Sequence, residues 1–278
     1  MLFRSNLNKQ PFNIDSTEIF KKHDGLNLKE SISYNYLCYL LFYNLKKSET
    51  FNQLKKLNDN TYLGFNDPYI NIEKIKVSTD KIVSLFDFEK INKSFNLDNI
   101  KNILELGAGS GRTCEAILTL RDNIKYILCD ITPAIYISYN RLKSAFPKKK
   151  ISLLIDITDK VELDRKINES DIMFIFPHQL ELLNKKIIDL TIAIDCIHEM
   201  DKSTIKHYFK IFNYITKFVY LSIWNKTDVP FSKNIFRKKN ILNYDTGDYE
   251  IPENWENIFR EKIVFPSNQI SLGFEIKD

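Results

Sequence analysis

At 278 residues and 32.8 kDa, the chain is long enough for one large α/β domain with a helical extension. An apolar content of 44% and an aromatic content of 13% exclude an intrinsically disordered chain. The formal charge of +4 is too small to indicate a nucleic-acid partner, so we expect none. The short basic runs at 148–150 and 237–239 are interpreted as solvated surface.

The cysteines and the N-terminal segment bear on the compartment. Cys38, Cys114, Cys129 and Cys196 show no paired C-x-x-C spacing and lie in apolar segments, which predicts buried, reduced thiols. No basic start followed by an apolar run and a cleavage site is found, so we expect a cytoplasmic protein. The apolar stretch 34–45 is too short to cross a bilayer and predicts a buried helix without membrane insertion.

Residues 1–99 show mostly helical patterning, with apolar residues at helix-like spacing between Tyr36 and Leu45. The segment 61–72 contains Gly64, Asp67 and Pro68 and is interpreted as a connection. We therefore predict an N-terminal helical cap or substrate region at 1–99 and a catalytic domain at 100–278.

From Lys101 onward, short apolar runs alternate with longer amphipathic stretches, which is typical of a sheet with crossover helices. A helical stripe follows the fifth run, with Asp201 or Ser203 available as its N-cap. The pattern predicts an α/β, Rossmann-like domain with a central, mostly parallel, seven-stranded sheet and an antiparallel C-terminal hairpin at 262–265 and 270–276. The other candidate strands are 102–106, 126–129, 151–155, 172–176, 190–194 and 218–224.

A glycine-rich loop follows the first of these strands and reads E-L-G-A-G-S-G from Glu105 to Gly111. Its glycines let the backbone turn sharply and approach a ligand closely. The dinucleotide fingerprint G-x-G-x-x-G fails because Arg112 occupies its third glycine position. Glu105 would repel a pyrophosphate but suits a ligand with a cationic amino group and a sulfonium. The loop therefore predicts S-adenosylmethionine as the cofactor, bound by Glu105, Gly107, Ala108, Gly109 and Gly111.

Acidic residues end the next two predicted strands. Asp130 ends I-L-C-D, where it can accept hydrogen bonds from both ribose hydroxyls, and Ile131 beside it is a further predicted cofactor contact. Asp156 ends L-L-I-D and could meet the adenine amino group, although a helix N-cap or a turn role stays equally open.

The segment I-A-I-D-C-I-H-E-M-D places Asp195, His198 and Glu199 just past a strand's carboxyl end, where α/β active sites lie. We predict His198 as the general base, with Glu199 or Asp195 orienting it or binding a substrate hydroxyl, and Asp195 as a further cofactor contact. Capping or packing by His198 stays open, as does a divalent metal held with Asp201, although no metal is predicted. His178 and Gln179 either line the substrate pocket or act structurally.

Several motifs together carry a family resemblance. They read V-S-T-D at 77–80, F-P-H-Q-L-E-L-L at 176–183, H-E-M at 198–200, V-Y-L-S-I-W at 219–224 and Y-E-I-P-E-N-W at 249–255. With the glycine loop, they make the chain resemble a family of class I sugar O-methyltransferases from bacterial surface-glycan gene clusters. Asp195, Cys196 and Ser222 depart from the family's pattern.

The resemblance implies methylation of a hydroxyl on a nucleotide-activated or glycan-linked sugar in bacterial surface polysaccharide biosynthesis, such as that of a capsule. A methyltransferase acting on a small amine or a phosphate-containing metabolite is the alternative. N-D-P-Y at 66–69 resembles the tetrapeptide of nucleic-acid amino methyltransferases, but it follows a polar stretch and indicates a turn. Tyr62, Tyr249 and Trp255 either stack on a sugar or belong to the core. The oligomeric state is left open, with a homodimer as one option.

Overall fold

The computed structural model describes residues 15–57, 68–230, 241–245, 249–263 and 269–277. Tyr62, the basic run 237–239 and the first half of the N-D-P-Y tetrapeptide lie outside these ranges. The chain divides into two compact units, Met1–Glu89 and Lys90–Asp278. Their boundary lies inside helix α4, whereas the sequence pattern placed it at 99/100.

The first unit is built around the long helix α3, which begins with a capping box between Asn27 and Glu30. The segment interpreted as a connection includes a strand, because β1 and β2 form an antiparallel hairpin closed by the two-residue turn Glu73–Lys74. The elements are α2 (Ser16–Ile19), α3 (Leu28–Leu45), η1 (Phe51–Lys56), β1 (Ile70–Ile72), β2 (Ile75–Val77) and α4 (Thr79–Phe95), which continues into the second unit.

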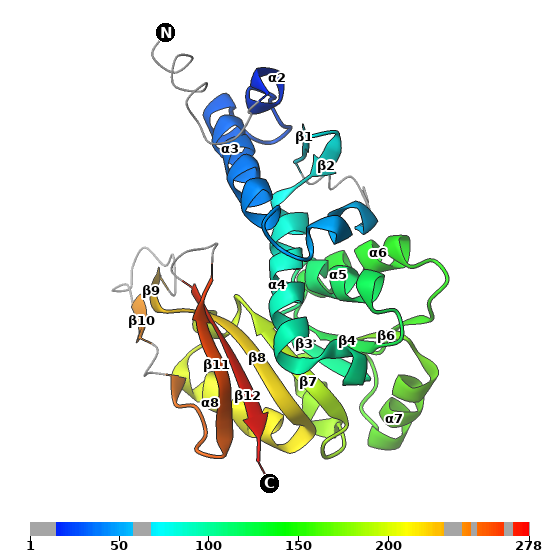
Figure 1. Cartoon of the computed structure of the whole chain (residues 1–278). Helices are drawn as coiled ribbons and strands as arrows, with labels where there is room; N and C mark the ends of the chain where they lie inside the picture. Colours follow the sequence, from blue (N-terminus) through cyan, green and yellow to red (C-terminus); the bar gives the residue numbers. More distant parts are fainter. Residues whose placement is uncertain (1–14, 58–67, 231–240, 246–248, 264–268, 278) are drawn as a thin grey trace, which may run out of the picture. The chain divides into compact units, whose positions relative to one another are not determined.

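The second unit contains an eight-stranded sheet in the order β11-β12-β8-β7-β3-β4-β6-β5 (Figure 1). All neighbours from β8 to β5 pair in parallel, whereas β12 is antiparallel to both β8 and β11. The strands are β3 (Asn102–Leu106), β4 (Lys125–Cys129), β5 (Ile151–Leu153), β6 (Ile172–Ile175), β7 (Ile188–Ile194), β8 (Thr216–Trp224), β11 (Trp255–Lys262) and β12 (Gln269–Ile276).

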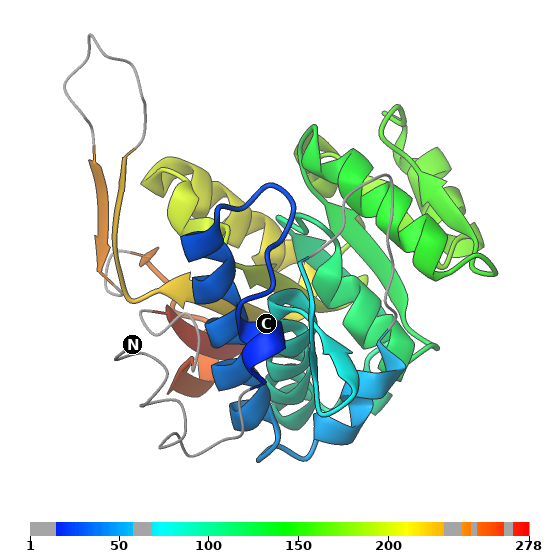
Figure 2. The ribbon, with the colours of Figure 1, turned by 90° about the horizontal axis from the view of Figure 1, so that it is seen from above.

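Helices and short turns connect these strands. The apolar stripe predicted after β7 forms α8, and the Asp201 side chain caps it by accepting the Thr204 N–H at 2.8 Å. The connecting elements are η2 (Leu97–Asn99), α5 (Arg112–Leu120), α6 (Ala134–Ala145), α7 (Lys160–Glu169), η3 (Pro177–Leu182), η4 (Ile197–Glu199) and α8 (Lys202–Ile215). Strands β9 (Lys226–Pro230) and β10 (Ile241–Asp245) form a separate ribbon that projects beyond the end of β8 (Figure 2).

Side chains on the two faces of the sheet pack against different helices. Leu104, Ile127 and Val219 belong to one core cluster with apolar residues of α7 and α8. On the other face, Phe174 of β6 packs against Tyr139 of α6, and Phe218 of β8 packs against Phe95. Layers on both faces explain why the parallel strands are nearly continuously apolar in sequence.

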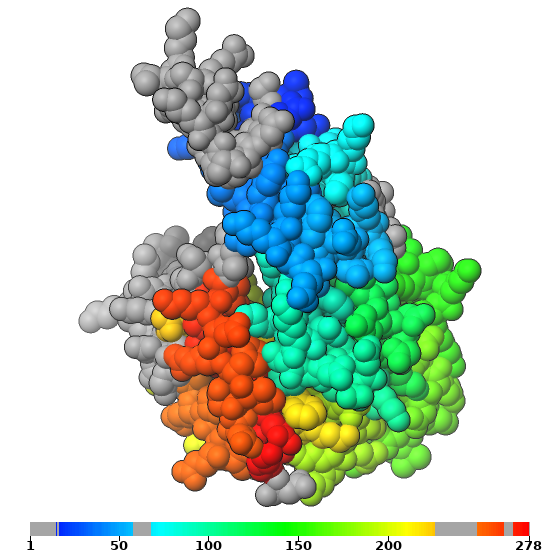
Figure 3. Space-filling view, viewed as in Figure 1, coloured from blue at the N-terminus to red at the C-terminus, as the bar shows by residue number. Residues whose placement is uncertain are grey.

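The predicted fold class is confirmed, with corrections in detail. The sheet has eight strands instead of the predicted seven, with β5 at one edge and β11 at the other. The antiparallel C-terminal hairpin is confirmed, but its first strand, β11, runs from Trp255 to Lys262 and so ends where the predicted strand 262–265 begins. Residues 264–265 lie outside the described ranges. The sequence pattern did not indicate a strand at 255–262, because β11 is a sheet edge whose side chains are mostly polar and exposed. The orange surface in Figure 3 shows this exposure.

Candidate functional site

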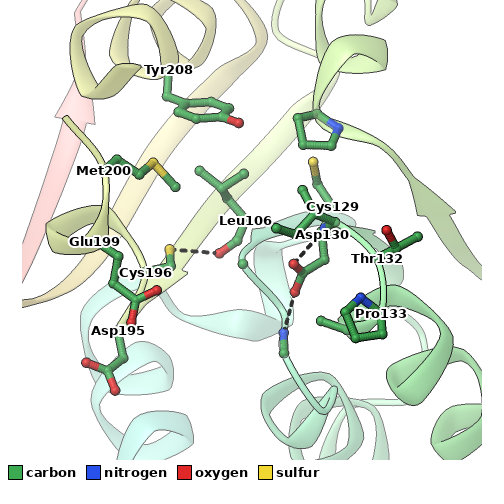
Figure 4. A pocket seen from close by; sticks show the side chains of 15 residues that line it. Leu106, Cys129, Asp130, Thr132, Pro133, Asp195, Cys196, Glu199, Met200 and Tyr208 are labelled. Atoms are coloured by element: carbon green, nitrogen blue, oxygen red, sulfur yellow. Dashed lines mark hydrogen bonds between the residues drawn. The ribbon is translucent and has the colours of Figure 1, made fainter. Parts of the chain in front are cut away.

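A cavity of about 520 Å³ opens at the carboxyl ends of β3, β4 and β7 (Figure 4). The chain leaves β3 toward β4 on one side, and β7 pairs with β3 on the other, so the cavity lies at a topological switch point. In open α/β sheets, ligands bind at such points. The lining residues are Leu106, Gly107 and Gly109 at the end of β3, Cys129 to Ala134 at the end of β4, Pro177 after β6, Asp195, Cys196, Glu199 and Met200 after β7, and Tyr208 of α8.

The three glycines of the loop have positive φ angles of 68°, 54° and 77°, which explains their identity. A Cβ on Gly107 would lie 2.5 Å from the Cβ of Cys196, so no other residue fits there. At Gly109 no atom lies within 4 Å of a Cβ position, and the backbone borders the cavity. Gly111 starts α5 and donates its N–H to the Ala108 carbonyl at 2.8 Å. Ala108 and Gly111 therefore shape the loop without lining the cavity.

Asp130 joins the glycine loop to the end of β4. One carboxylate oxygen accepts the Gly109 N–H at 2.6 Å, and the other accepts the Ile131 N–H at 2.7 Å (Figure 4). Each oxygen keeps acceptor capacity for a second donor. The side chain is half-buried at the cavity wall, so a hydroxyl-bearing ligand can reach it.

The wall after β7 is organised around Asp195, which has a positive φ of 56°. Its Oδ1 accepts the indole N–H of Trp224 at 2.8 Å and a bond from the amide of Gln269, two residues on strands β8 and β12. His198 Nε2 lies 3.3 Å from the same oxygen. Three side chains remote from the glycine loop thus hold one carboxylate at the cavity.

His198 lies behind this wall and does not line the cavity. Its side chain is only 3% exposed, and its ring packs 5.2 Å from the Trp224 ring. Burial lowers the pKa of His198, and the nearby Asp195 carboxylate partly opposes that shift. Among the described residues, nothing is hydrogen-bonded to Nδ1, which is also buried. A general base must reach the substrate's proton, so the predicted role for His198 is not favoured by its placement.

Glu199 does line the cavity, and its pKa is raised by partial burial and by the charges of Asp195 and Asp130. Figure 4 shows Asp195 and Glu199 on one side of the cavity and Asp130 on the other. The remaining lining is largely apolar, with Leu106, Met200 and similar side chains. Three carboxylates in an apolar setting favour a ligand that carries positive charge.

Besides Ala108 and Gly111, two further predicted cofactor contacts are not brought to the cavity. Glu105 is 2% exposed, and its carboxylate accepts the Tyr126 hydroxyl at 2.9 Å, on the sheet face opposite to Leu106. Asp156 lies in an exposed turn after β5, and β6 separates β5 from β4. Pro177, which follows β6, lines the cavity instead. The strand order therefore moves the predicted adenine contact away from the site.

The other polar candidates have structural partners. Asp201 caps α8, which removes it from the set considered for a metal. Gln179 is buried and donates to the carbonyls of Leu154 and Ile157, both at 2.7 Å, whereas His178 is exposed. Within the described ranges, no group of three or more His, Cys, Asp or Glu side chains could hold a metal ion. Tyr249 and Trp255 are buried core residues.

The sequence reasoning missed several lining residues, among them Thr132, Pro133, Cys196, Met200 and Tyr208. Four of them adjoin predicted positions in the chain, so extending each predicted strand end by a few residues would have found them. Tyr208 comes from the middle of α8 and carries no local signal. The predicted buried, unpaired state of the four cysteines is confirmed, and Cys196 Sγ lies 3.2 Å from the Leu106 carbonyl.

Comparisons with known proteins give only distant structural likenesses. No family model and no curated protein matches the sequence. The PH0226 protein from Pyrococcus horikoshii OT3 has 13% identity over 69% of this chain and 92% of its own, with a TM-score of 0.44. An S-adenosylmethionine-dependent methyltransferase from Clostridium acetobutylicum ATCC 824 has 12% identity over 70% and 91%, with a TM-score of 0.43. The mitomycin 7-O-methyltransferase MmcR has 9% identity over 85% and 60%, also with 0.43.

Similarity at this level does not identify a function, so a functional proposal must rest on the residues of the cavity. The structure adds one general observation. None of the helices that it describes has the length and apolar character needed to span a membrane.

Proposed function

We propose that the chain is an S-adenosylmethionine-dependent methyltransferase that binds its cofactor in the cavity at the ends of β3, β4 and β7. The observation that carries this proposal is the bond between Gly109 and Asp130, which joins a glycine loop to an acidic strand end at the switch point. The bound cofactor supplies a methyl group on a positively charged sulfonium. A volume of about 520 Å³ lies within the range of small-molecule sites.

Five of the lining residues have a defined role in this proposal. Gly109 leaves room for the ligand where a side chain would intrude. The free acceptor sites of Asp130 receive the ribose hydroxyls, and Ile131 covers the ligand from the same segment. Asp195 and Glu199 supply the negative charge that a cationic amino acid portion requires.

We further propose an O-methyltransferase acting on a sugar hydroxyl in bacterial surface polysaccharide biosynthesis, which is supported by the sequence resemblance. An alcohol must lose its proton as its oxygen bonds to the methyl carbon and the carbon–sulfur bond breaks. Glu199 is the group at the cavity whose raised pKa favours proton acceptance. His198 is assigned a positioning role, because it acts on Asp195 from behind the wall.

Calorimetric titration tests the cofactor assignment directly. S-adenosylmethionine should bind with micromolar affinity, and more tightly than its demethylated product, since the product lacks the sulfonium charge that the three carboxylates favour. The same titration with added magnesium tests the metal alternative. If neither compound binds, the proposed function is wrong.

Turnover assays then test the acceptor. Nucleotide sugars should accelerate formation of the demethylated product. If small amines or phosphate-containing metabolites do so and nucleotide sugars do not, the alternative acceptor class is correct.

A further inference from the structure

Gln269 is a buried polar side chain at the first position of β12, with only 3% of its surface exposed. Glutamine is seldom buried and loses much rotamer freedom when it is fixed, so its amide needs partners for both of its ends. The Gln269 Nε2 donates to Oδ1 of Asp195, and its Oε1 accepts the Ser222 hydroxyl at 3.2 Å. The amide therefore links β8 to the cavity wall after β7.

Asp195, Ser222 and Gln269 form a closed ring of hydrogen bonds. Asp195 donates its backbone N–H to the Ser222 carbonyl at 2.9 Å. The Ser222 hydroxyl donates to Gln269, and Gln269 donates to the Asp195 carboxylate, which closes the ring. Asp195 has a φ of 56°, a conformation that is unfavourable for any residue with a Cβ. The ring thus holds both the strained backbone and the side chain of Asp195.

The two oxygens of the Asp195 carboxylate are used differently. Oδ1 accepts the Trp224 indole N–H at 2.8 Å and the Gln269 amide, and His198 Nε2 lies 3.3 Å away from it. Within the described ranges, Oδ2 accepts no hydrogen bond. The Asp195 side chain is 53% exposed and lines the cavity, so Oδ2 is the acceptor that remains for a ligand.

Core packing alone does not require a glutamine at position 269. A buried hydrogen-bonded group can often be replaced by an apolar group of similar shape at little cost. In Gln269→Leu, Trp224 still donates to Asp195, so the carboxylate keeps one partner. What the variant loses is the ring that fixes the conformation of Asp195.

We propose that Gln269 is a positioning residue for the cationic, amino acid portion of the cofactor and that it acts through Asp195. The inference rests on the proposed function, because it takes S-adenosylmethionine as the ligand of the cavity. A carboxylate that is already fixed loses no conformational freedom when a cationic group binds, which raises the affinity. The nucleoside portion meets Asp130 and the glycine loop on the other wall, so Gln269 does not contribute to its binding.

The test compares two ligands that differ in the amino acid portion. S-adenosylhomocysteine, the demethylated product, contains this portion, whereas methylthioadenosine keeps the nucleoside and the sulfur without it. In calorimetry on the full-length protein, Gln269→Leu should weaken binding of S-adenosylhomocysteine by roughly tenfold and of methylthioadenosine by less than about twofold. A merely structural role would weaken both ligands equally, because the whole cavity would change.

A double-mutant cycle tests whether Gln269 acts through Asp195. In the Asp195→Asn background, Gln269→Leu should change the affinity for S-adenosylhomocysteine by less than about twofold, because the charge that Gln269 positions is already absent. Ser222→Ala removes only the hydroxyl that orients the amide and should weaken binding of the same ligand by roughly threefold. If Gln269→Leu does not fold, Ser222→Ala takes its place in both comparisons.

Ser271→Ala is the matched control. Ser271 is a buried polar residue of the same strand, but its hydroxyl donates to the Glu261 carbonyl at 3.4 Å, so the variant should bind both ligands as the wild type does. The inference is overturned if Gln269→Leu leaves S-adenosylhomocysteine binding unchanged, weakens both ligands equally, or keeps its full effect in the Asp195→Asn background. If the wild type binds neither ligand, the proposed function fails as well, whereas a negative result in Gln269→Leu alone leaves the proposed function standing.

Discussion

The cavity at the carboxyl ends of β3, β4 and β7 has two walls that are built in different ways. After β3 and β4, backbone groups of adjacent segments hold the Asp130 carboxylate through the N–H groups of Gly109 and Ile131. After β7, side chains from distant strands hold Asp195, with Trp224 and Gln269 as the donors. One wall therefore depends on glycine and local geometry, whereas the other depends on the packing of the whole sheet.

The largest expected loss of stability concerns helix α6, which supports the glycine loop of the wall after β3 and β4. Arg141 of α6 is buried, pairs with buried Glu115 at 2.6 Å and donates to the Ser110 hydroxyl of the glycine loop at 3.1 Å. Arg141→Met leaves a carboxylate buried without its ion partner, so the free energy of unfolding should fall by about 3–5 kcal/mol. Chemical denaturation measures this loss.

The double variant Arg141→Met/Glu115→Leu distinguishes loop positioning from general stability. Replacing both charges by apolar groups should restore most of the lost stability. The bond to Ser110 stays broken, so affinity for S-adenosylmethionine should remain below that of the wild type. Full recovery of affinity would show that Arg141 does not position the loop.

The next largest effect on stability is expected where the two walls are in contact, at Gly107 and Cys196. In Gly107→Ala the new Cβ collides with Cys196, and the alanine must also adopt the positive φ of this position. We therefore expect the free energy of unfolding to fall by about 3 kcal/mol. Gly109→Ala has the same backbone strain but open space, so it should cost about 1 kcal/mol. Its methyl group borders the cavity, however, and should weaken cofactor binding. Equal losses of stability in the two variants would contradict the contact between the walls.

The difference between a wall held by local backbone groups and a wall held by distant side chains also explains which parts of the site could be predicted from the sequence. Gly107, Gly109 and Asp130 lie in strand–loop segments whose spacing specifies their geometry, and the structure joins them as expected. The role of His198 was harder to predict, because its burial depends on Trp224 and on Asp195, whose conformation Gln269 helps to fix from 74 residues away.

Strand order is the second limit of the sequence. The pattern predicts strands at 151–155 and 172–176 and gives Asp156, at the end of the first of them, as a possible adenine contact. The structure inserts β6 between β4 and β5, so Asp156 leaves the site and Pro177 takes its place. Nothing local to Asp156 encodes that insertion, since both segments read equally well as buried strands.

A smaller effect separates the two carboxylates themselves. Asp130→Asn replaces one acceptor of a backbone N–H by an NH₂ donor, so it should lower both stability, by about 1–3 kcal/mol, and cofactor affinity. Asp195→Asn keeps an oxygen for Trp224 and Gln269 and should weaken S-adenosylmethionine binding by roughly tenfold with little change in stability. Calorimetry and thermal melting on both variants test this contrast. A larger loss of stability in Asp195→Asn would mean that side chains hold their wall more tightly than backbone groups hold the other.

The smallest effect is the pH dependence that buried His198 adds to the second wall. Burial lowers its pKa below the ordinary value of 6.5, so the unfolded chain binds a proton at pH values where the folded protein does not. The free energy of unfolding should therefore fall as the pH drops through 6.5, until the pH reaches the lowered pKa. Denaturation at pH 7.5 and 5.5 should show this slope in the wild type and in His207→Gln, whose histidine is exposed, but not in His198→Gln. If the slope survives in His198→Gln, burial does not keep this histidine neutral, and its assignment as a positioning residue behind Asp195 fails.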